Sequence, residues 1–306
     1  MTEHSIYPQE SIFRTSLVRT ALVRTALIPT PLIRALRSAA IHLTLALTCF
    51  VTAFPFLWMA VSSLKTKEEV MSAQTLWPAV PQYGNYLSIL TDSPIPRYLA
   101  NSFFVSVSVV LIQLVCCSLF AYAVTFMRAG CRDMLFRLVL FTYMVPTAAT
   151  YIPCYMILSR MGLLDSYGGL ILSNGVSVFG IFLLRQAFKG VPSETMEAAR
   201  MDGAGHLSIL IHVVYPMTRP SFVTFILLSF ISTYNSYMWP SLITDTPRFS
   251  LVSQGLRTFL YEGGAYGTQW SLVMAAGTVV VAPLLILFAA AWRWIINGIT
   301  DLGCKG

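Results

Sequence analysis

Residues 192–220 read PSETMEAARMDGAGHLSILIHVVYPMTRP and form a polar segment between two long apolar runs. The spacing predicts a short helix, a turn and a second helix, since Gly203 and Gly205 supply a break after Asp202. The second helix is expected to begin near Leu207 and is largely apolar. Because most other segments of the chain resemble membrane spans, we expect this polar segment at a membrane face, where it can contact a soluble partner.

The first of these two helices has features that suit a docking surface. Ser193 is a plausible N-cap, and Glu194 and Glu197 suit a first helical turn because acidic side chains are stabilised near a helix N-terminus. Ala198 and Ala199 leave little side-chain bulk on one face, so another backbone can approach closely. The competing interpretation is an ordinary capped helix in a loop between two spans.

The composition indicates a membrane protein. The chain has 306 residues, of which 56% are hydrophobic and only 11% are charged, too few to cover the surface of a soluble globule. The formal net charge is +7, but the basic residues are scattered and do not alternate with aromatic residues, which argues against nucleic acid as a partner. The six cysteines show no paired spacing typical of a zinc site or a disulfide, and we interpret them as apolar filler.

Six apolar runs are each long enough to cross about 30 Å of hydrocarbon. None of them contains Asp, Glu, Lys or Arg. They are residues 41–64, 99–127, 138–158, 167–184, 220–244 and 270–292. The sequence therefore predicts an all-α integral membrane protein with six transmembrane helices.

Residues 1–40 precede these runs and contain a five-residue repeat that starts at Arg14, Arg19, Arg24 and Pro29. A period of five matches neither the helical nor the strand repeat. We interpret this segment as a low-complexity cytoplasmic leader. The alternative is that its arginines lie on the anionic inner leaflet.

The orientation follows from the distribution of Lys and Arg, which are enriched in cytoplasmic loops. With the N-terminus inside, 14 of the 20 Lys and Arg residues fall on the inner face and six on the outer face. We therefore expect both termini and the polar segment in the cytoplasm. The outer segments 65–98 and 245–269 either contact an extracytoplasmic partner or are simple connectors.

The polar segment contains a Glu-Ala-Ala triplet, then Asp-Gly-Ala, then a proline thirteen positions after the glycine: Glu197, Ala198, Ala199, Asp202, Gly203, Ala204 and Pro216. This spacing resembles the EAA loop of binding-protein-dependent ABC importer permeases, with the pattern of their sugar-uptake branch. Residues 63–66, 98–102 and 235–240 are also similar to that branch. The chain ends in Gly303, Cys304, Lys305 and Gly306, where the branch usually ends in Gly-Val-Lys-Gly, and the resemblance covers roughly residues 41–306.

The resemblance implies a type I ABC importer permease fold for residues 41–306, with a coupling loop at about residues 188–219. It also implies the partners: a homologous second permease, a dimer of ATP-binding subunits that hold ATP and Mg, and an extracytoplasmic solute-binding protein. The complex would lie in the lipid of a bacterial inner membrane. The ATPase-docking residues would be Glu197, Ala198, Ala199, Asp202, Gly203 and Ala204, and the tail residues Gly303, Lys305 and Gly306 would reach between the ATPase subunits.

Several functions are disfavoured by what the chain lacks. It contains no Gly-x-x-x-x-Gly-Lys-Ser/Thr phosphate-binding loop, so ATP hydrolysis would belong to another polypeptide. His42, His206 and His212 are too scattered for a metal site, and no constellation of His, Asp and Glu suggests a membrane-embedded enzyme. A secondary transporter or channel would be expected to show charged residues in its spans or two similar halves, and neither is seen.

A solute path is predicted from polar residues inside the apolar runs: Thr233, Tyr234, Asn235, Ser236 and Tyr237 in the fifth run and Asn174 in the fourth. At helical spacing Asn235 shares a face with Ile231 and Met238, and the adjoining face is also polar. The polar arc that the two faces form together is too wide for a single contact between two helices. Hydroxyls, amides and aromatic rings suit a neutral, polyhydroxylated solute. We predict a sugar or oligosaccharide, with a glycerol-phosphate-type solute as the alternative; for any single residue, helix packing is the competing interpretation.

Overall fold

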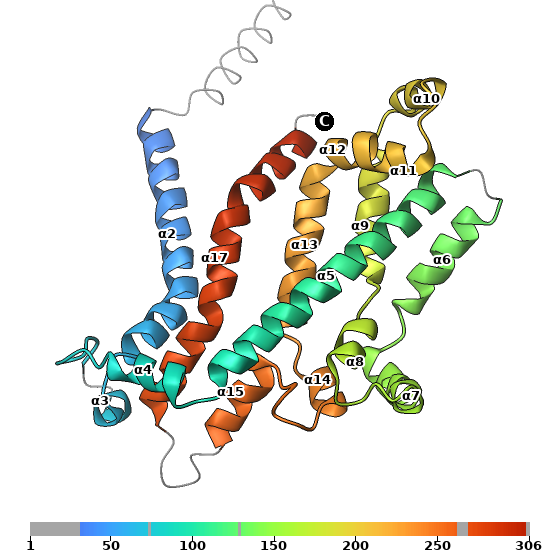
Figure 1. Ribbon diagram of the computed structural model, residues 1–306. Coiled ribbons are helices and arrows are strands. Elements are labelled where there is room, and N and C mark those ends of the chain that lie inside the picture. The colour runs from blue at the N-terminus through green and yellow to red at the C-terminus, as the bar shows by residue number, and fades with distance from the viewer. Residues whose placement is uncertain (1–30, 73–74, 128–129, 262–268, 304–306) are drawn as a thin grey trace, which may run out of the picture. The chain divides into compact units, whose positions relative to one another are not determined.

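The computed structural model describes residues 31–72, 75–127, 130–261 and 269–303, and all regular secondary structure in these ranges is helical (Figure 1). Residues 1–58 and 59–306 form two compact units, which are described separately. Helix α2 (Pro31–Ser62) carries the first apolar run, has Pro55 inside it, and continues into the second unit with its last residues. The last ten residues of the predicted leader therefore belong to this helix, whereas the five-residue repeat lies outside the described residues.

Helix α5 (Ile95–Phe126) is the centre of the second unit. It packs against α9 (Val178–Lys189) and α13 (Arg219–Tyr234), and α13 also packs against the long helix α17 (Trp270–Gly303). Helices α9 and α13 approach closely at Gly180, where an added Cβ would lie 2.2 Å from the ring of Phe225. Any larger residue at this position would push the two helices apart.

Three of the six apolar runs are not continuous helices, contrary to the simplest form of the prediction. Each is divided in two: α6 (Arg132–Thr142) and α7 (Thr147–Arg160), α8 (Tyr167–Leu172) and α9, and α13 and α14 (Met238–Ile243). Pro146 stands directly before α7 with an extended backbone, and because proline has no N–H and restricts the residue before it, α6 cannot run through. Helices α6 and α7 consequently meet at 99°.

Within the described residues, three helices are long and apolar enough to cross a membrane on their own: Arg37–Ser62, Ile95–Phe126 and Trp270–Trp292. The number rises to five if the bent pair of α6 and α7, and the pair of residues 206–217 and α13 that bends by 88°, each count as one span. The prediction of an all-helical membrane fold is confirmed. The count of six spans stays a prediction.

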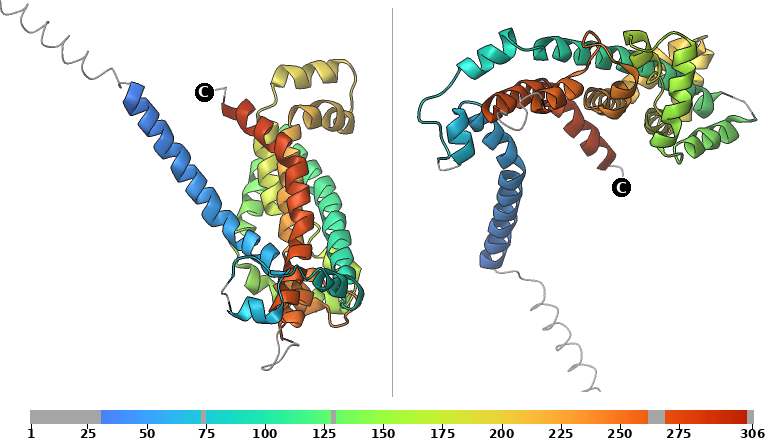
Figure 2. Two further views of the ribbon diagram at one scale, coloured as in Figure 1. Left: turned by 90° about the vertical axis from the view of Figure 1, so that its left-hand side faces the viewer. Right: turned by 90° about the horizontal axis from the view of Figure 1, so that it is seen from below.

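The polar segment and the outer segments lie at opposite ends of the second unit. Helices α10 (Ser193–Met201), α11 (His206–Ile209), the π-helix Leu210–Val214 and α12 (Tyr215–Met217) form one end, from which α10 projects (Figure 2). At the other end lie α3 (Lys67–Ser72), α4 (Gly84–Thr91) and α15 (Val252–Tyr261) (Figure 1). The two kinds of predicted contact surface are therefore separated by the length of the helices.

Candidate functional site

The N-terminus of α10 differs from the predicted one. Pro192 occupies the N-cap position with φ −60° and ψ 135°, and no side chain caps the helix. The assignment of Ser193 as N-cap is wrong because the extended backbone of Pro192 places Ser193 as the first helical residue. Glu194 lies in the first turn as expected, whereas Glu197 falls in the second turn.

The C-terminus of α10 explains the Asp-Gly-Ala triplet. Gly203 has φ +81°, the left-handed conformation that glycine adopts without a Cβ penalty. Its N–H donates to the Arg200 carbonyl at 3.0 Å, and the N–H of Ala204 donates to the Ala199 carbonyl at 3.0 Å. These two hydrogen bonds form a Schellman motif, which ends the helix at Asp202 and satisfies its last carbonyls.

Helix α10 has one face turned to the core and one turned outward. Met196 is buried, and Ala199 and Ala204 pack against the same buried cluster. Glu197 and Ala198 are exposed. The expectation that Ala198 and Ala199 share a docking face is wrong because consecutive helical residues point about 100° apart. The outward face is completed by Met201, which is 88% exposed.

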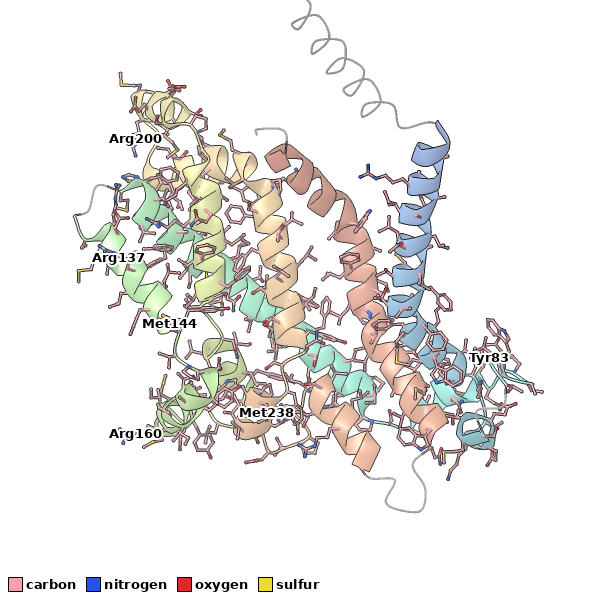
Figure 3. The ribbon with its side chains drawn as sticks, turned by 180° about the vertical axis from the view of Figure 1, so that it is seen from behind. Tyr83, Arg137, Met144, Arg160, Arg200 and Met238 are labelled. Carbon is pink, nitrogen blue, oxygen red and sulfur yellow. The ribbon has the colours of Figure 1, made fainter. Side chains whose placement is uncertain are left out.

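The polar segment is fastened to the end of α5. The Tyr122 hydroxyl lies 3.1 Å from His206 Nδ1, and the Arg200 guanidinium donates to the Phe126 carbonyl at 3.4 Å. Figure 3 shows Arg200 and Arg137 toward the same end of the molecule and Arg160 at the other. Helices α10 and α11 are therefore each joined to the end of α5 by a hydrogen bond.

A cavity of about 1020 Å³ opens among α5, α9, α13 and the joint between α6 and α7. Its lining consists of short polar side chains with apolar and aromatic ones between them: Gln113, Thr142, Tyr143, Met144, Val145, Pro146, Thr147, Thr150, Asn174, Val176, Ser177, Val178, Phe179, Phe225, Leu228, Ser229, Ser232, Thr233 and Ser236. This lining contains no Asp, Glu, Lys, Arg or His. The cavity is thus polar and uncharged on the side that this chain supplies.

Gln113 ties the lining together from the middle of α5. Its Nε2 donates to the Asn174 carbonyl at 2.7 Å, and its Oε1 accepts a hydrogen bond from the Ser229 hydroxyl. One turn further along α5, Cys117 Sγ lies 3.4 Å from both the N–H and the carbonyl oxygen of Ser177. These contacts satisfy backbone groups that the break between α8 and α9 leaves free, which lipid could not do.

The structure brings together three of the six residues predicted for the solute path: Asn174, Thr233 and Ser236 line the cavity. Tyr234 is buried and donates to the Val280 carbonyl at 2.9 Å, on the side of α17. Asn235 caps the C-terminus of α13 and is exposed. The predicted common face of Ile231, Asn235 and Met238 is wrong because the helix ends before Asn235.

Other lining residues were not assigned to the solute path from the sequence, above all Gln113, Ser177, Ser229 and the threonines on both sides of Pro146. Gln113 and Ser177 could have been found from the sequence, since each is a polar residue inside an apolar run. The threonines could not, because a helical threonine donates its hydroxyl to a backbone carbonyl of the preceding turn and is common in membrane spans. Tyr237 lies outside the lining. The centre of its ring is 5.3 Å from the guanidinium carbon of Arg257.

The predicted tail is only partly described. Gly303 is the last residue of α17, and Lys305 and Gly306 lie outside the described residues together with Cys304. In the part of the chain that the structure describes, no group of three His, Cys, Asp or Glu side chains is placed to hold a metal ion.

The comparisons with known proteins agree on one kind of protein. Residues 115–301 match the family model described as binding-protein-dependent transport system inner membrane component. The sn-glycerol-3-phosphate transport system permease protein UgpE of Yersinia pestis bv. Antiqua (strain Antiqua) is 30% identical over 267 residues, which is 85% of this chain and 95% of that protein. The UgpE protein of Brucella abortus (strain 2308) is 27% identical over 268 residues, with the same coverage.

Among solved structures, the fold is similar to a chain in the crystal structure of a bacterial ABC transporter involved in the import of the acidic polysaccharide alginate. The TM-score is 0.77 at 22% identity, covering 87% of this chain and 98% of that chain. A second structure, of bacterial alginate ABC transporter in complex with alginate pentasaccharide-bound periplasmic protein, gives a TM-score of 0.61 at 14% identity, covering 87% and 99%. At these identities the likeness establishes the fold.

Proposed function

Because the chain belongs to the family of binding-protein-dependent transport system inner membrane components, whose members are permeases of ABC importers, we propose that its cavity is one half of the translocation path for a sugar or oligosaccharide. The observation that carries this proposal is the uncharged polar lining. Hydroxyl and amide groups exchange hydrogen bonds with sugar hydroxyls at about 0.5–1.5 kcal/mol each. The rings of Tyr143 and Phe179 offer faces for stacking on a pyranose.

A glycerol-phosphate-type solute is the second candidate, and the two similar sn-glycerol-3-phosphate permeases favour it. An anion in a low-dielectric cavity needs a cationic partner. Since the lining of this chain has no Lys, Arg or His, a second permease would have to supply that charge. The lining of this half favours the neutral solute.

A homologous second permease completes the cavity in this proposal. The rim formed by Tyr143 and Met144 is 68% and 78% exposed although both side chains are large and apolar. Such a rim beside a polar cavity is suited to contact with a partner of similar fold rather than with water.

A dimer of ATP-binding subunits, which holds the ATP and Mg, docks on the outward face of α10 in this proposal. The support is geometric: α10 projects beyond the helix ends, its Schellman motif fixes the turn, and Glu197, Ala198 and Met201 face outward. Docking of the ATPase subunits on α10 requires α10 in the cytoplasm, which agrees with the Lys and Arg distribution. The solute-binding protein then delivers its solute at the opposite end.

The test is uptake by the complete transporter, reconstituted in proteoliposomes with its ATPase and binding protein. A disaccharide, an oligosaccharide and sn-glycerol-3-phosphate are offered in turn. ATP-dependent uptake of a neutral sugar supports the proposal, and uptake restricted to the phosphate ester selects the second candidate. Uptake that continues without ATP would overturn the ATP-driven mechanism.

Docking is tested separately with Glu197→Lys. This exchange reverses the charge on the outward face of α10 without touching its buried side. We expect the ATPase subunits to be lost from the complex in a pull-down, with the permease still present in the membrane. Ser193→Lys, an exposed change at the other end of the helix, is the matched control and should retain the ATPase. Equal retention by both variants contradicts docking on this face.

A further inference from the structure

The segment between α2 and α5 exposes large apolar side chains on an ordered loop. Residues 75–91 contain no Asp, Glu, Lys or Arg. Four of their side chains, which we call the outer patch, are strongly exposed: Leu76 (53%), Trp77 (68%), Val80 (65%) and Tyr83 (71%). Leu87 on α4 continues the patch at 64% exposure. Contiguous apolar exposure of this kind marks a contact surface.

The first of the contacts that hold the outer patch in place comes from Lys65. Its side chain is fully buried, and its Nζ donates to the Thr75 carbonyl at 2.6 Å, directly before the patch begins. The N–H of Gln82 donates to the Leu64 carbonyl at 2.8 Å, near the end of the patch. Both ends of the patch are therefore tied to the stretch that follows α2.

Glu69 holds the middle of the loop. Its Oε1 accepts the N–H of Ala79 and its Oε2 accepts the N–H of Thr66, both at 3.0 Å. These backbone N–H groups, that of Thr66 most, hold the pKa of the Glu69 carboxyl below its ordinary value, so the carboxylate keeps both bonds at neutral pH.

The position of the outer patch points to the membrane boundary. The segment begins where α2 ends at Ser62 and finishes where α5 begins at Ile95, and both helices are long and apolar enough to cross a membrane. In Figure 3, Tyr83 lies on the side of the second unit opposite Met144 and Arg160, at a level between these two. Tyr83 therefore lies to one side of the second unit, at a level short of Arg160.

We propose that the outer patch lies in the headgroup region of the outer leaflet and anchors this end of the permease to lipid. Trp77 and Tyr83 are the residue types that concentrate at membrane–water interfaces, where an apolar ring and a polar N–H or O–H are both satisfied. Leu76 and Val80 then contact the upper acyl chains. The lack of charge over residues 75–91 suits a lipid surface better than a soluble partner recognised through ion pairs.

The test measures the surroundings of the patch directly. A nitroxide is attached at Trp77→Cys, Val80→Cys or Tyr83→Cys, one at a time, in a full-length chain that keeps the buried Cys117 and has its other native cysteines replaced. The labelled chain is studied within the complete transporter in lipid nanodiscs. Collision rates with oxygen, which concentrates in lipid, and with a water-soluble nickel chelate are compared by power saturation. The label at position 80 leaves both aromatic residues in place, and Glu68→Cys on α3 is the exposed, polar control.

We expect oxygen collisions to exceed nickel collisions several-fold at positions 77, 80 and 83, with the reverse at position 68. Higher nickel collisions at the patch would place it in water, and low values for both probes would show that protein covers it; either result overturns the proposal. Addition of the transporter's solute-binding protein should leave the values at position 80 unchanged. A fall in both collision rates on this addition would instead make the patch a protein dock.

A second variant tests the role of Lys65. Lys65→Met keeps the length of the side chain and removes the donor to Thr75. The label at position 80 should then become more mobile and its nickel collision rate should rise several-fold. An unchanged spectrum would overturn the role of Lys65 in holding the patch. If this variant does not assemble, the three positions with Lys65 intact decide the proposal alone.

Discussion

The proposed coupling loop around α10 and the polar cavity differ in how the chain builds them. The proposed docking site is contiguous, since its helix, its turn and its Glu-Ala-Ala and Asp-Gly-Ala residues all lie within residues 192–204. The cavity is assembled from α5, the joint between α6 and α7, the break before α9, and α13. A contiguous site can be recognised in the sequence from the spacing of its residues. An assembled site cannot, because it depends on which helices become neighbours.

The largest effect is expected at Gly203, where the contiguous site depends on one backbone conformation. Gly203→Val places a β-branched residue at φ +81°, a conformation that costs an ordinary L-residue about 1–2 kcal/mol and a β-branched one more. We expect solute-stimulated ATP hydrolysis of the reconstituted transporter to fall by more than about tenfold, because the Schellman turn that ends α10 is lost.

Gly203→Asn is the matched control, because asparagine tolerates the left-handed region. An added Cβ meets no atom within 4 Å at this position, so side-chain size alone should not matter. Most of the stimulated activity should therefore remain. Equal loss in the valine and asparagine variants would show that the residue acts through contact with the partner and not through its backbone.

The second effect concerns Gln113, on which the assembled site depends. Gln113→Met keeps the volume but leaves the Asn174 carbonyl and the Ser229 hydroxyl without this partner, at a cost of about 1–3 kcal/mol for a buried group left unsatisfied. We expect uptake to fall roughly tenfold and the thermal unfolding midpoint of the purified permease to fall with it.

A double-mutant cycle with Ser229→Ala sharpens this expectation. If Gln113 acts through Ser229, the double variant should lose less stability than the sum of the two single losses, because both single variants break the same hydrogen bond. Strictly additive losses would separate the two residues and weaken the interpretation of Gln113 as the tie between α5 and α13.

The same contrast explains what the sequence could and could not predict. The helical membrane architecture, the turn at Gly203 and the acidic first turn at Glu194 depend on local composition and backbone preference, and all three are present. The break before α9 is different. It is stable because Gln113 and Cys117, some 60 residues earlier, form hydrogen bonds with its free backbone N–H and carbonyl groups. No local pattern in residues 173–177 predicts these bonds.

The solute path shows the same limit from another side. Placing Asn235 on a helical face assumed that α13 continues through residue 238, and the helix ends at Tyr234. The polar residues of the fifth run then divide: Thr233 and Ser236 line the cavity, whereas Tyr234 turns to α17. Helical spacing predicts a shared face only for residues that lie within one continuous helix.

This division gives the third prediction. Thr233→Val with Ser236→Ala removes two lining hydroxyls that have no hydrogen-bond partner among the described residues, so stability should not change. Uptake of a neutral sugar should fall about threefold to tenfold, the loss of one or two neutral hydrogen bonds. Asn235→Ala, outside the lining, should transport nearly normally. A larger loss of uptake in Asn235→Ala than in the double variant would favour the solute path predicted from the sequence. It would contradict the cavity as the site of that path.

The smallest effect is expected at Asp165, at the predicted outer end, where an exposed carboxylate joins two loops. Its Oδ1 accepts the N–H groups of Asp245 and Thr246 at 3.0 Å each, and its Oδ2 accepts the Thr246 hydroxyl at 2.8 Å. The Thr246 N–H is the main cause that holds the pKa of the Asp165 carboxyl below its ordinary value. A carboxyl whose pKa is lower in the folded protein stabilises it above the unfolded pKa of about 3.9, and this stabilisation disappears as pH falls through the folded pKa.

Asp165→Asn tests this linkage with little disturbance, because asparagine keeps an acceptor oxygen and tolerates the φ of 51° found at this position. Hydrogen exchange of the amides of residues 244–250 is compared between the two proteins from pH 7 down to about pH 3. At neutral pH the wild type should exchange more slowly by a small factor, since an exposed carboxylate contributes little through solvent. The difference should shrink as the pH falls below about 4 and vanish once the pH is below the lowered folded pKa, where protonation makes the two side chains nearly equivalent. A difference that is the same at pH 7 and pH 3 would show that charge on Asp165 does not hold the two loops together.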